Sequence, residues 1–223
     1  ELSAFSKCEE VFFENTDMDP NAVNAPDYPF GIEQIKDAVS EDTVIVSIAA
    51  GVSMDSLGRM FGRSLKFVRC MPNTPALVGM GCTGVCCNEL VTRDEMQQSL
   101  SLLQSFGLAE EVPEKLMDAV VGVSGSSPAY VFLFLEALAD GAVQAGMPRA
   151  QAYRFAAQSI MGSAALALET GKHPGEPKDM VCSPGGTTIE AVQVLEDRGF
   201  RSSVMHAVSA CVERCRALSK DET

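Results

Sequence analysis

Residues 183–190 have the composition best suited to binding a small anion. They read Ser-Pro-Gly-Gly-Thr-Thr-Ile-Glu, so two glycines stand immediately before a predicted helix start. Glycines leave backbone N–H groups accessible to a ligand, and the positive end of the helix dipole favours negative charge there. Thr187 and Glu190 have capping-box spacing. The stretch therefore predicts a carboxylate or phosphate cradle, and the spacing alone leaves open a merely capped helix after a tight turn.

A second stretch, residues 124–130, combines serines and a glycine with a proline that opens a predicted helix. Its hydroxyl and N–H groups are potential ligands. Residues 122–126 also come within one position of the G-x-S-x-G nucleophile elbow, followed in order by Asp140 and His173. Because Ser126 replaces the last glycine and no clear strand precedes the turn, we disfavour a serine hydrolase.

Residues 79–84 match the dinucleotide pattern G-x-G-x-x-G, but their context differs from that of the motif. The motif should follow a strand, open a helix and meet an acidic residue about twenty positions later. Here it leads into a predicted strand, and Gln104 stands at that distance. We therefore interpret this match as fortuitous.

Composition limits the class of protein. The chain has 223 residues, of which 46% are hydrophobic and 21% charged, enough for one large folded domain or two small ones. Its net charge of -13, without a basic stripe, disfavours nucleic-acid binding. The sequence shows no uninterrupted apolar run of spanning length and no export signal, so we expect no membrane partner and a cytoplasmic location. The eight cysteines lack the spacing of a zinc site and are expected to be reduced thiols, so we predict no metal.

Strands and helices alternate in the first half of the chain after a loop-like stretch of about thirty residues, which is typical of an α/β domain. We predict helices at residues 32–39, 53–61 and 92–106, the last two capped by Ser53 and Thr92, and strands at residues 43–48, 66–71, 82–87 and 108–112.

From residue 113 onward, only helical patterns remain. The helix after Pro128 is apolar on every side except at Glu136, Asp140 and Gln144, so we expect it to be buried nearly all round. The following helix is rich in small residues between Ala156 and Ala167. These two helices predict a subunit interface, and a self-contained helical core is the alternative.

Three motifs, at residues 70–76, 124–130 and 179–190, together closely resemble those of the pyrroline-5-carboxylate reductase family. The resemblance extends from residue 43 to residue 219. It implies a Rossmann-like, dinucleotide-binding α/β domain at residues 1–112, truncated here, followed by an all-α dimerisation and substrate-binding domain at residues 113–223. A homodimer, or a larger ring of dimers, is the implied assembly.

The resemblance implies hydride transfer from NADPH, with NADH as the alternative, to the imine carbon of 1-pyrroline-5-carboxylate, which gives L-proline. An iminium accepts hydride without a protein base, so positioning and electrostatic support suffice. The alternative is a non-catalytic, cofactor-deficient homologue that retains only the dimeric helical domain. The third hypothesis for the function is a related imine or β-hydroxyacid dehydrogenase. Such an enzyme needs a catalytic lysine, and we cannot assign one in this sequence.

The resemblance also assigns roles to individual residues, with Thr188 as the catalytic residue whose hydroxyl faces the imine nitrogen. Two departures from the family pattern are visible: Ser127 replaces the glycine of its serine turn, and no G-x-G-x-x-G turn precedes Gly31, so we expect the phosphate-binding unit to be missing. The implied substrate-binding residues are Ser183, Gly185, Gly186, Thr187 and Thr188, and those lining the nicotinamide side are Ala49, Ala50, Gly51, Met71, Pro72 and Asn73.

Overall fold

The computed structural model describes residues 28–221. The predicted N-terminal loop therefore lies outside the described residues, apart from its last three positions. These begin helix α1 (Tyr28–Ile35), which starts and ends four residues earlier than predicted. A proline in the first turn of a helix is tolerated because its missing N–H would have no intrahelical acceptor there, which allows Pro29 inside α1.

The chain divides into two compact units. The first contains the chain up to Pro128 and the segment from Val208 onward, and the second is Ala129–Ala207. The long C-terminal helix α9 (Phe200–Asp221) thus contributes residues to both units. The boundary between the predicted α/β domain and the predicted helical domain, at residues 112/113, stays a prediction.

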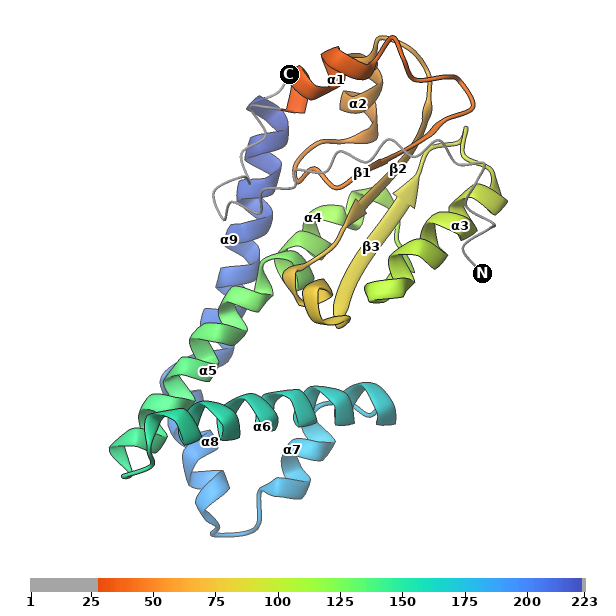
Figure 1. The fold of residues 1–223 in the computed structure, drawn as a ribbon. Helices are drawn as coiled ribbons and strands as arrows, with labels where there is room; N and C mark the ends of the chain where they lie inside the picture. Colours follow the sequence, from red (N-terminus) through yellow and green to blue (C-terminus); the bar gives the residue numbers. More distant parts are fainter. Residues whose placement is uncertain (1–27, 222–223) are drawn as a thin grey trace. The chain divides into compact units, whose positions relative to one another are not determined.

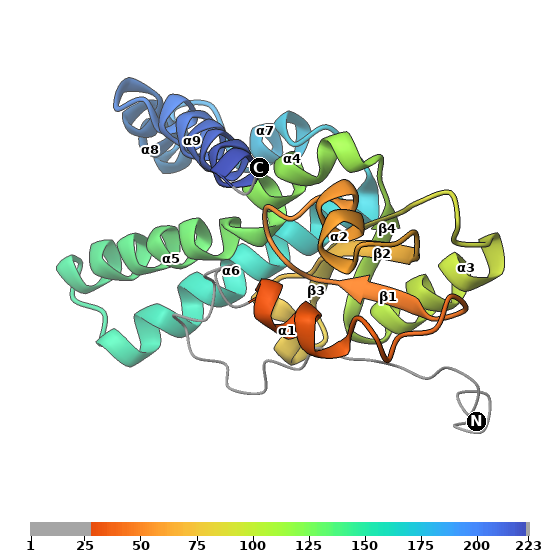
Figure 2. The ribbon, with the colours of Figure 1, turned by 90° about the horizontal axis from the view of Figure 1, so that it is seen from above.

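The first unit is built on a four-stranded sheet of order β1-β2-β3-β4 within the described residues (Figures 1 and 2). Its strands are β1 (Val44–Ser47), β2 (Lys66–Met71), β3 (Gly81–Cys87) and β4 (Gly107–Glu111). The β1/β2 and β3/β4 pairs are parallel, as expected for alternating strands and helices, whereas β2 and β3 are antiparallel. A short 3-10 turn (Thr74–Val78) connects β2 to β3, and a parallel crossover would need a much longer connection.

Helices pack on both faces of this sheet, so that α2 and α3 lie on opposite sides (Figures 1 and 2). Helix α2 (Met54–Phe61) begins where predicted, with the Ser56 N–H donating to Ser53 Oγ at 3.1 Å. Helix α3 (Arg93–Leu103) has the predicted capping box between Thr92 and Glu95. One core cluster joins the sheet to α1 and α2 through Ile32, Ile45, Leu57, Phe61 and Phe67, and the other joins it to α3 through Val68, Val85, Met96, Leu100 and Leu103.

Close packing explains two of the three glycines in the fortuitous dinucleotide pattern. A Cβ atom at Gly81 would lie 2.9 Å from the Phe106 carbonyl, and one at Gly84 would lie 2.9 Å from the Val120 side chain. Both glycines belong to β3 and not to a strand-to-helix turn. The interpretation that residues 79–84 do not bind phosphate is therefore consistent with their place in the fold.

The helical stretch Glu114–Gln144 continues through the segment that we expected to interrupt it. Between α4 (Met117–Val120) and α5 (Ser127–Gln144) the backbone forms a π-turn (Val121–Gly125), in which the Ser126 N–H donates to the Val121 carbonyl at 2.8 Å. By length and composition this stretch could cross a membrane, and 11% of its most apolar window is buried. The expectation that no apolar run reaches spanning length was therefore wrong.

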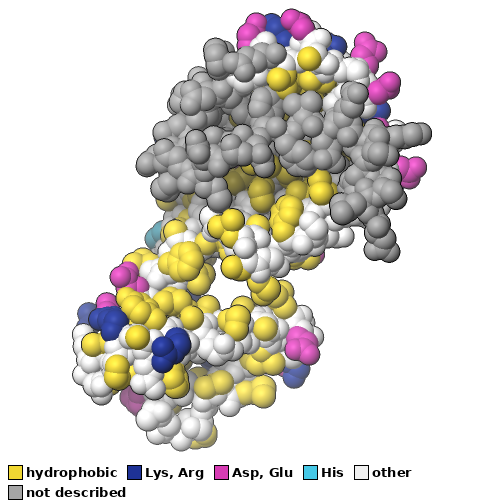
Figure 3. All heavy atoms as spheres, viewed as in Figure 1, with side chains coloured by type: hydrophobic (Ala, Val, Ile, Leu, Met, Phe, Trp, Pro, Cys, Tyr) yellow, Lys and Arg dark blue, Asp and Glu magenta, His cyan; other side chains and the backbone are white. Residues whose placement is uncertain are grey.

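The second unit is entirely helical in the described chain. It contains most of α5, then α6 (Arg149–Thr170), α7 (Gly175–Val181), α8 (Thr187–Asp197) and the start of α9. The side chains of Phe132 and Leu133 on α5 are 64% and 70% exposed, and Figure 3 shows hydrophobic side chains gathered on the surface of this unit. The helix that we expected to be buried nearly all round is thus largely exposed within one chain.

Candidate active site

The first turn of α8 is open at its N-terminus. Its N-cap is Gly186, with extended backbone (φ −83°, ψ 170°) and no side-chain cap hydrogen bond. The capping box predicted between Thr187 and Glu190 was therefore wrong, because Thr187 is already the first helical residue. The first N–H groups of a helix have no intrahelical partner. Without a side-chain cap, those of α8 are available to an anion.

The turn before α8 requires its two glycines. Gly185 has a φ of +65°, in the left-handed region that side chains disfavour. Gly186 donates its N–H to the Ser183 carbonyl at 3.0 Å, and a Cβ atom added at Gly186 would lie 2.3 Å from Ser183 Oγ. Ser183 and Gly185 are exposed, and Thr188, on the first turn of the helix, is half-buried. The sequence between them thus folds into a narrow loop with accessible backbone.

The second predicted group of residues lies in the first unit, at the carboxyl ends of β1 and β2. These strands are parallel, with Ser47 opposite Arg69, so the segments that follow them leave the sheet at the same edge. Ligands of α/β sheets bind outside the carboxyl ends of the strands. Residues 49–51 form the turn after β1, and residues 71–73 end β2 and begin the next loop. The structure thus brings both predicted nicotinamide-side segments to one edge.

Asn73 is engaged by protein partners on both sides of its amide. Its Nδ2 donates to the Ser124 carbonyl at 3.0 Å, and its Oδ1 accepts the Cys82 N–H at 2.8 Å. A Cβ atom at Gly125 would lie 3.3 Å from Met71 Cε. The π-turn therefore packs against the predicted cofactor segment. This contact was not predicted from the sequence. Because both atoms of its amide already bond to the protein, Asn73 contributes to that segment through its shape.

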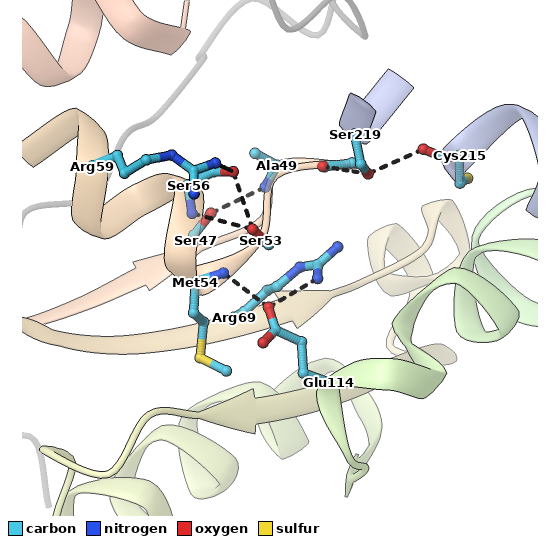
Figure 4. Close-up of polar contacts among 11 residues, drawn as sticks. Ser47, Ala49, Ser53, Met54, Ser56, Arg59, Arg69, Glu114, Cys215 and Ser219 are labelled. Atoms are coloured by element: carbon cyan, nitrogen blue, oxygen red, sulfur yellow. Dashed lines mark hydrogen bonds and ion pairs between the residues drawn. The ribbon is translucent and has the colours of Figure 1, made fainter. Parts of the chain in front are cut away.

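An ion pair between a buried arginine and a half-buried glutamate anchors the same edge of the sheet, as Figure 4 shows. Arg69 on β2 is 6% exposed, and its Nη1 lies 3.2 Å from Glu114 Oε1. The same carboxylate oxygen accepts the Met54 N–H at 2.8 Å, so one side chain joins β2 to the first turn of α2. Sequence reasoning missed this pair. Its one signal was an arginine between two apolar residues in the middle of a strand, because a charged side chain that is buried there needs a partner.

The described residues offer little support for nucleophilic or metal chemistry. Burial raises the pKa of the Cys70 thiol to about 12 and that of Cys86 to about 11, which disfavours their reactive thiolates at neutral pH. His173 Nδ1 accepts the Gly175 N–H at 3.1 Å, as expected for a loop residue. Among the described residues no group of three or more His, Cys, Asp or Glu side chains could hold a metal ion. Binding by backbone and shape therefore fits this site best.

Comparison with known proteins agrees with this arrangement. Residues 114–218 match the family described as pyrroline-5-carboxylate reductase dimerisation. The chain is 57% identical over 189 residues to pyrroline-5-carboxylate reductase from Escherichia coli K12, covering 85% of this chain and 70% of the relative. It is 41% identical over 219 residues to the Arabidopsis thaliana enzyme, covering 98% of this chain and 79% of the relative.

Solved structures give the same result. Plasmodium falciparum pyrroline carboxylate reductase, crystallised with NADP bound, aligns with a TM-score of 0.82 and 34% identity over 86% of this chain and 77% of that one. The Coxiella burnetii reductase aligns with a TM-score of 0.81 and 36% identity over 86% of this chain and 72% of that one. The molecule thus has a Rossmann-like sheet combined with a helical dimerisation domain, which confirms the predicted fold class. The chain belongs to the pyrroline-5-carboxylate reductase family.

Proposed function

We propose that this chain transfers a hydride from NADPH, or alternatively NADH, to the imine of 1-pyrroline-5-carboxylate and so forms L-proline. The observation that carries the proposal is the uncapped N-terminus of α8 behind Gly185 and Gly186. A carboxylate is the ligand that such a terminus favours. Family membership supplies the substrate class to which that carboxylate belongs.

The substrate carboxylate would be held by the backbone N–H groups and hydroxyls of residues 183–188. Thr188 follows one residue after the helix start and is half-buried, and this position supports assigning its hydroxyl to a hydrogen bond with the ring nitrogen beside the bound carboxylate. A positioned hydrogen bond of this kind stabilises charge that develops at the nitrogen during reduction. We assign Thr188 this catalytic role.

The nicotinamide side of the dinucleotide would be held by residues 49–51 and 71–73. These residues fit such a ligand, because Ala49 and Ala50 have small side chains at the carboxyl edge of the sheet and Gly51 turns the backbone with a φ of +82°. The bound dinucleotide supplies the hydride. The chain's own contribution is to hold and orient each reactant.

We further propose that the working form is a homodimer, or a ring of dimers, in the cytoplasm, without nucleic-acid or membrane partners. The exposed apolar side chains of α5 supply a surface for a second copy, and the family match names a dimerisation domain. Covering that surface with a partner subunit accounts for the apolar stretch Glu114–Gln144 without a membrane. The net charge of -13 opposes binding to nucleic acid.

The experiment follows NADPH oxidation by the purified chain with 1-pyrroline-5-carboxylate, for the wild type, Thr188→Ala and Thr188→Ser. We expect Thr188→Ala to lower kcat/KM about a hundredfold and Thr188→Ser to retain most activity, because serine keeps the hydroxyl. Melting temperatures should stay close to the wild type. Unchanged kcat/KM in Thr188→Ala would remove Thr188 from the mechanism. A folded, dimeric wild type that oxidises no NADPH would favour the cofactor-deficient alternative.

A further inference from the structure

The C-terminal helix contacts the turn after β1 through one hydroxyl group. Ser219, near the end of α9, lies 168 positions along the chain from Gly51, yet its Oγ donates to the Gly51 carbonyl at 2.7 Å. The same hydroxyl also lies 3.1 Å from the Cys215 carbonyl one helical turn back. A serine in a helix commonly bonds to that preceding carbonyl. Here the shorter contact is the one to the distant turn (Figure 4).

Gly51 is the residue at which this turn changes direction. It is buried, and its φ of +82° lies in the left-handed region. A Cβ atom at Gly51 would stand 3.6 Å from Leu218 Cβ and 3.8 Å from Ser219 Oγ, so α9 packs directly against the turn. The direction of the Gly51 carbonyl is therefore set by its backbone conformation and by its acceptance of the Ser219 hydroxyl.

The two ends of the turn have other supports. At its start the Ala49 N–H lies 3.4 Å from Ser47 Oγ, which is a long contact. Beyond its end, Met54 donates its N–H to Glu114 Oε1 at 2.8 Å, and Ser53 caps α2. Ser219 thus contacts the last residue of the turn, between the long contact at Ala49 and the hydrogen bond at Met54. Figure 4 shows these contacts together.

A binding turn that is already held in its bound conformation loses less entropy when its ligand binds. The turn is predicted to present its backbone to the nicotinamide side of the dinucleotide, and small displacements of a positioning backbone lower affinity markedly. We propose that Ser219 is a positioning residue for the cofactor: its hydroxyl holds residues 49–51 in the conformation that binds the dinucleotide. This inference rests on the proposed function, and no sequence motif pointed to it.

The test compares Ser219→Ala with Ser219→Thr, which keeps the hydroxyl. The matched control is Ser101→Ala, because the Ser101 hydroxyl bonds to the Gln97 carbonyl one turn back in α3, away from the turn. Two measurements are made on the purified chain: hydrogen exchange of the amides of residues 49–53 without ligand, and NADPH affinity by fluorescence titration. Steady-state kinetics then give KM for NADPH and for the imine separately.

In Ser219→Ala we expect faster exchange in the turn but not in β2, and a Kd and KM for NADPH raised about fivefold, the loss typical of one hydrogen bond. The KM for the imine and the kcat at saturating NADPH should stay within about twofold of the wild type, since the α8 turn is untouched. Ser219→Thr and Ser101→Ala should resemble the wild type.

Equal NADPH affinity in Ser219→Ala and the wild type would overturn the positioning role while leaving the proposed function intact. A parallel rise in the KM of both substrates with a lower melting temperature would also overturn it, because that pattern indicates general destabilisation. A wild-type chain that binds no NADPH would contradict the proposed function, and the positioning role would fail with it.

Discussion

The turn before α8 depends on a missing Cβ atom at Gly186. Gly186→Ala would place that atom 2.3 Å from Ser183 Oγ and 3.1 Å from the Ser183 carbonyl, so the Ser183 side chain must rotate and its carbonyl must shift. Because the turn is proposed to hold the substrate carboxylate, we expect the KM for 1-pyrroline-5-carboxylate to rise at least about tenfold, with the KM for NADPH unchanged. Steady-state kinetics with each substrate varied in turn provide the measurement.

Gly58→Ala is the matched control for this substitution. Gly58 lies within α2, and a Cβ atom there would meet the Phe67 side chain at an ordinary 4.0 Å. Alanine in a helix interior should raise the free energy of unfolding by about 0.5–1 kcal/mol and leave both KM values unchanged. If Gly186→Ala kept the wild-type KM for the imine, the carboxylate cradle would have to be placed elsewhere.

Single residues also show where sequence reasoning reaches its limit. The need for glycine at positions 185 and 186 could be predicted, because a tight turn before a helix is a local requirement. The choice of Gly186 over Thr187 as N-cap could not, since it depends on how Ser183 folds back over the turn. Ser219 and Glu114 were beyond prediction for the same reason, because their partners are far along the chain.

At the scale of elements, strand β2 contains a thiol that stays protonated in the folded chain. Burial raises the pKa of Cys70 to about 12, and its Sγ donates to the Ser47 carbonyl at 3.4 Å. An unfolded cysteine has a pKa of about 8.5. The folded state therefore binds more protons than the unfolded state above that pH. The contribution of Cys70 to the free energy of unfolding is fully present below about pH 8.5 and is lost progressively toward pH 12.

We expect the free energy of unfolding to fall more steeply with pH in the wild type than in Cys70→Ala between about pH 8.5 and 10.5. Urea unfolding at several pH values measures both slopes. Val68→Ala is the control, because it shortens a neighbouring buried side chain of β2 that does not titrate. Its stability should be lower than that of the wild type by the same amount at every pH. Parallel curves for the wild type and Cys70→Ala would contradict the assignment.

Elements with local signals were predicted well, and those that depend on pairing were not. Strand β2 and the caps of α2 and α3 agree with the sequence, because burial pattern and capping act over a few residues. The antiparallel direction of β3 and the π-turn at Val121–Gly125 were missed. Both follow from contacts between distant segments, including the bond from Asn73 to the Ser124 carbonyl.

For the whole molecule, the apolar surface of α5 poses a choice between a partner subunit and a lipid bilayer. Phe132 and Leu133 are mostly exposed, together with Phe155 and Leu168 on α6. A helix with residues of this kind on several sides favours burial against other protein or lipid. The family match over residues 114–218 favours a second copy, so the two-helix surface is expected to be covered in a homodimer.

This expectation can be tested by placing a charge on α5. In a symmetric dimer each substitution occurs twice in the same interface, so Phe132→Asp removes apolar burial at two equivalent sites and leaves two carboxylates without partners. We expect analytical ultracentrifugation to show a dimer or larger assembly for the wild type and a monomer for Phe132→Asp.

Leu108→Asp is the control, because Leu108 is half exposed on β4 in the other unit, and it should keep the wild-type assembly. A wild type that is monomeric in buffer and partitions into lipid vesicles would instead assign the apolar surface to a membrane.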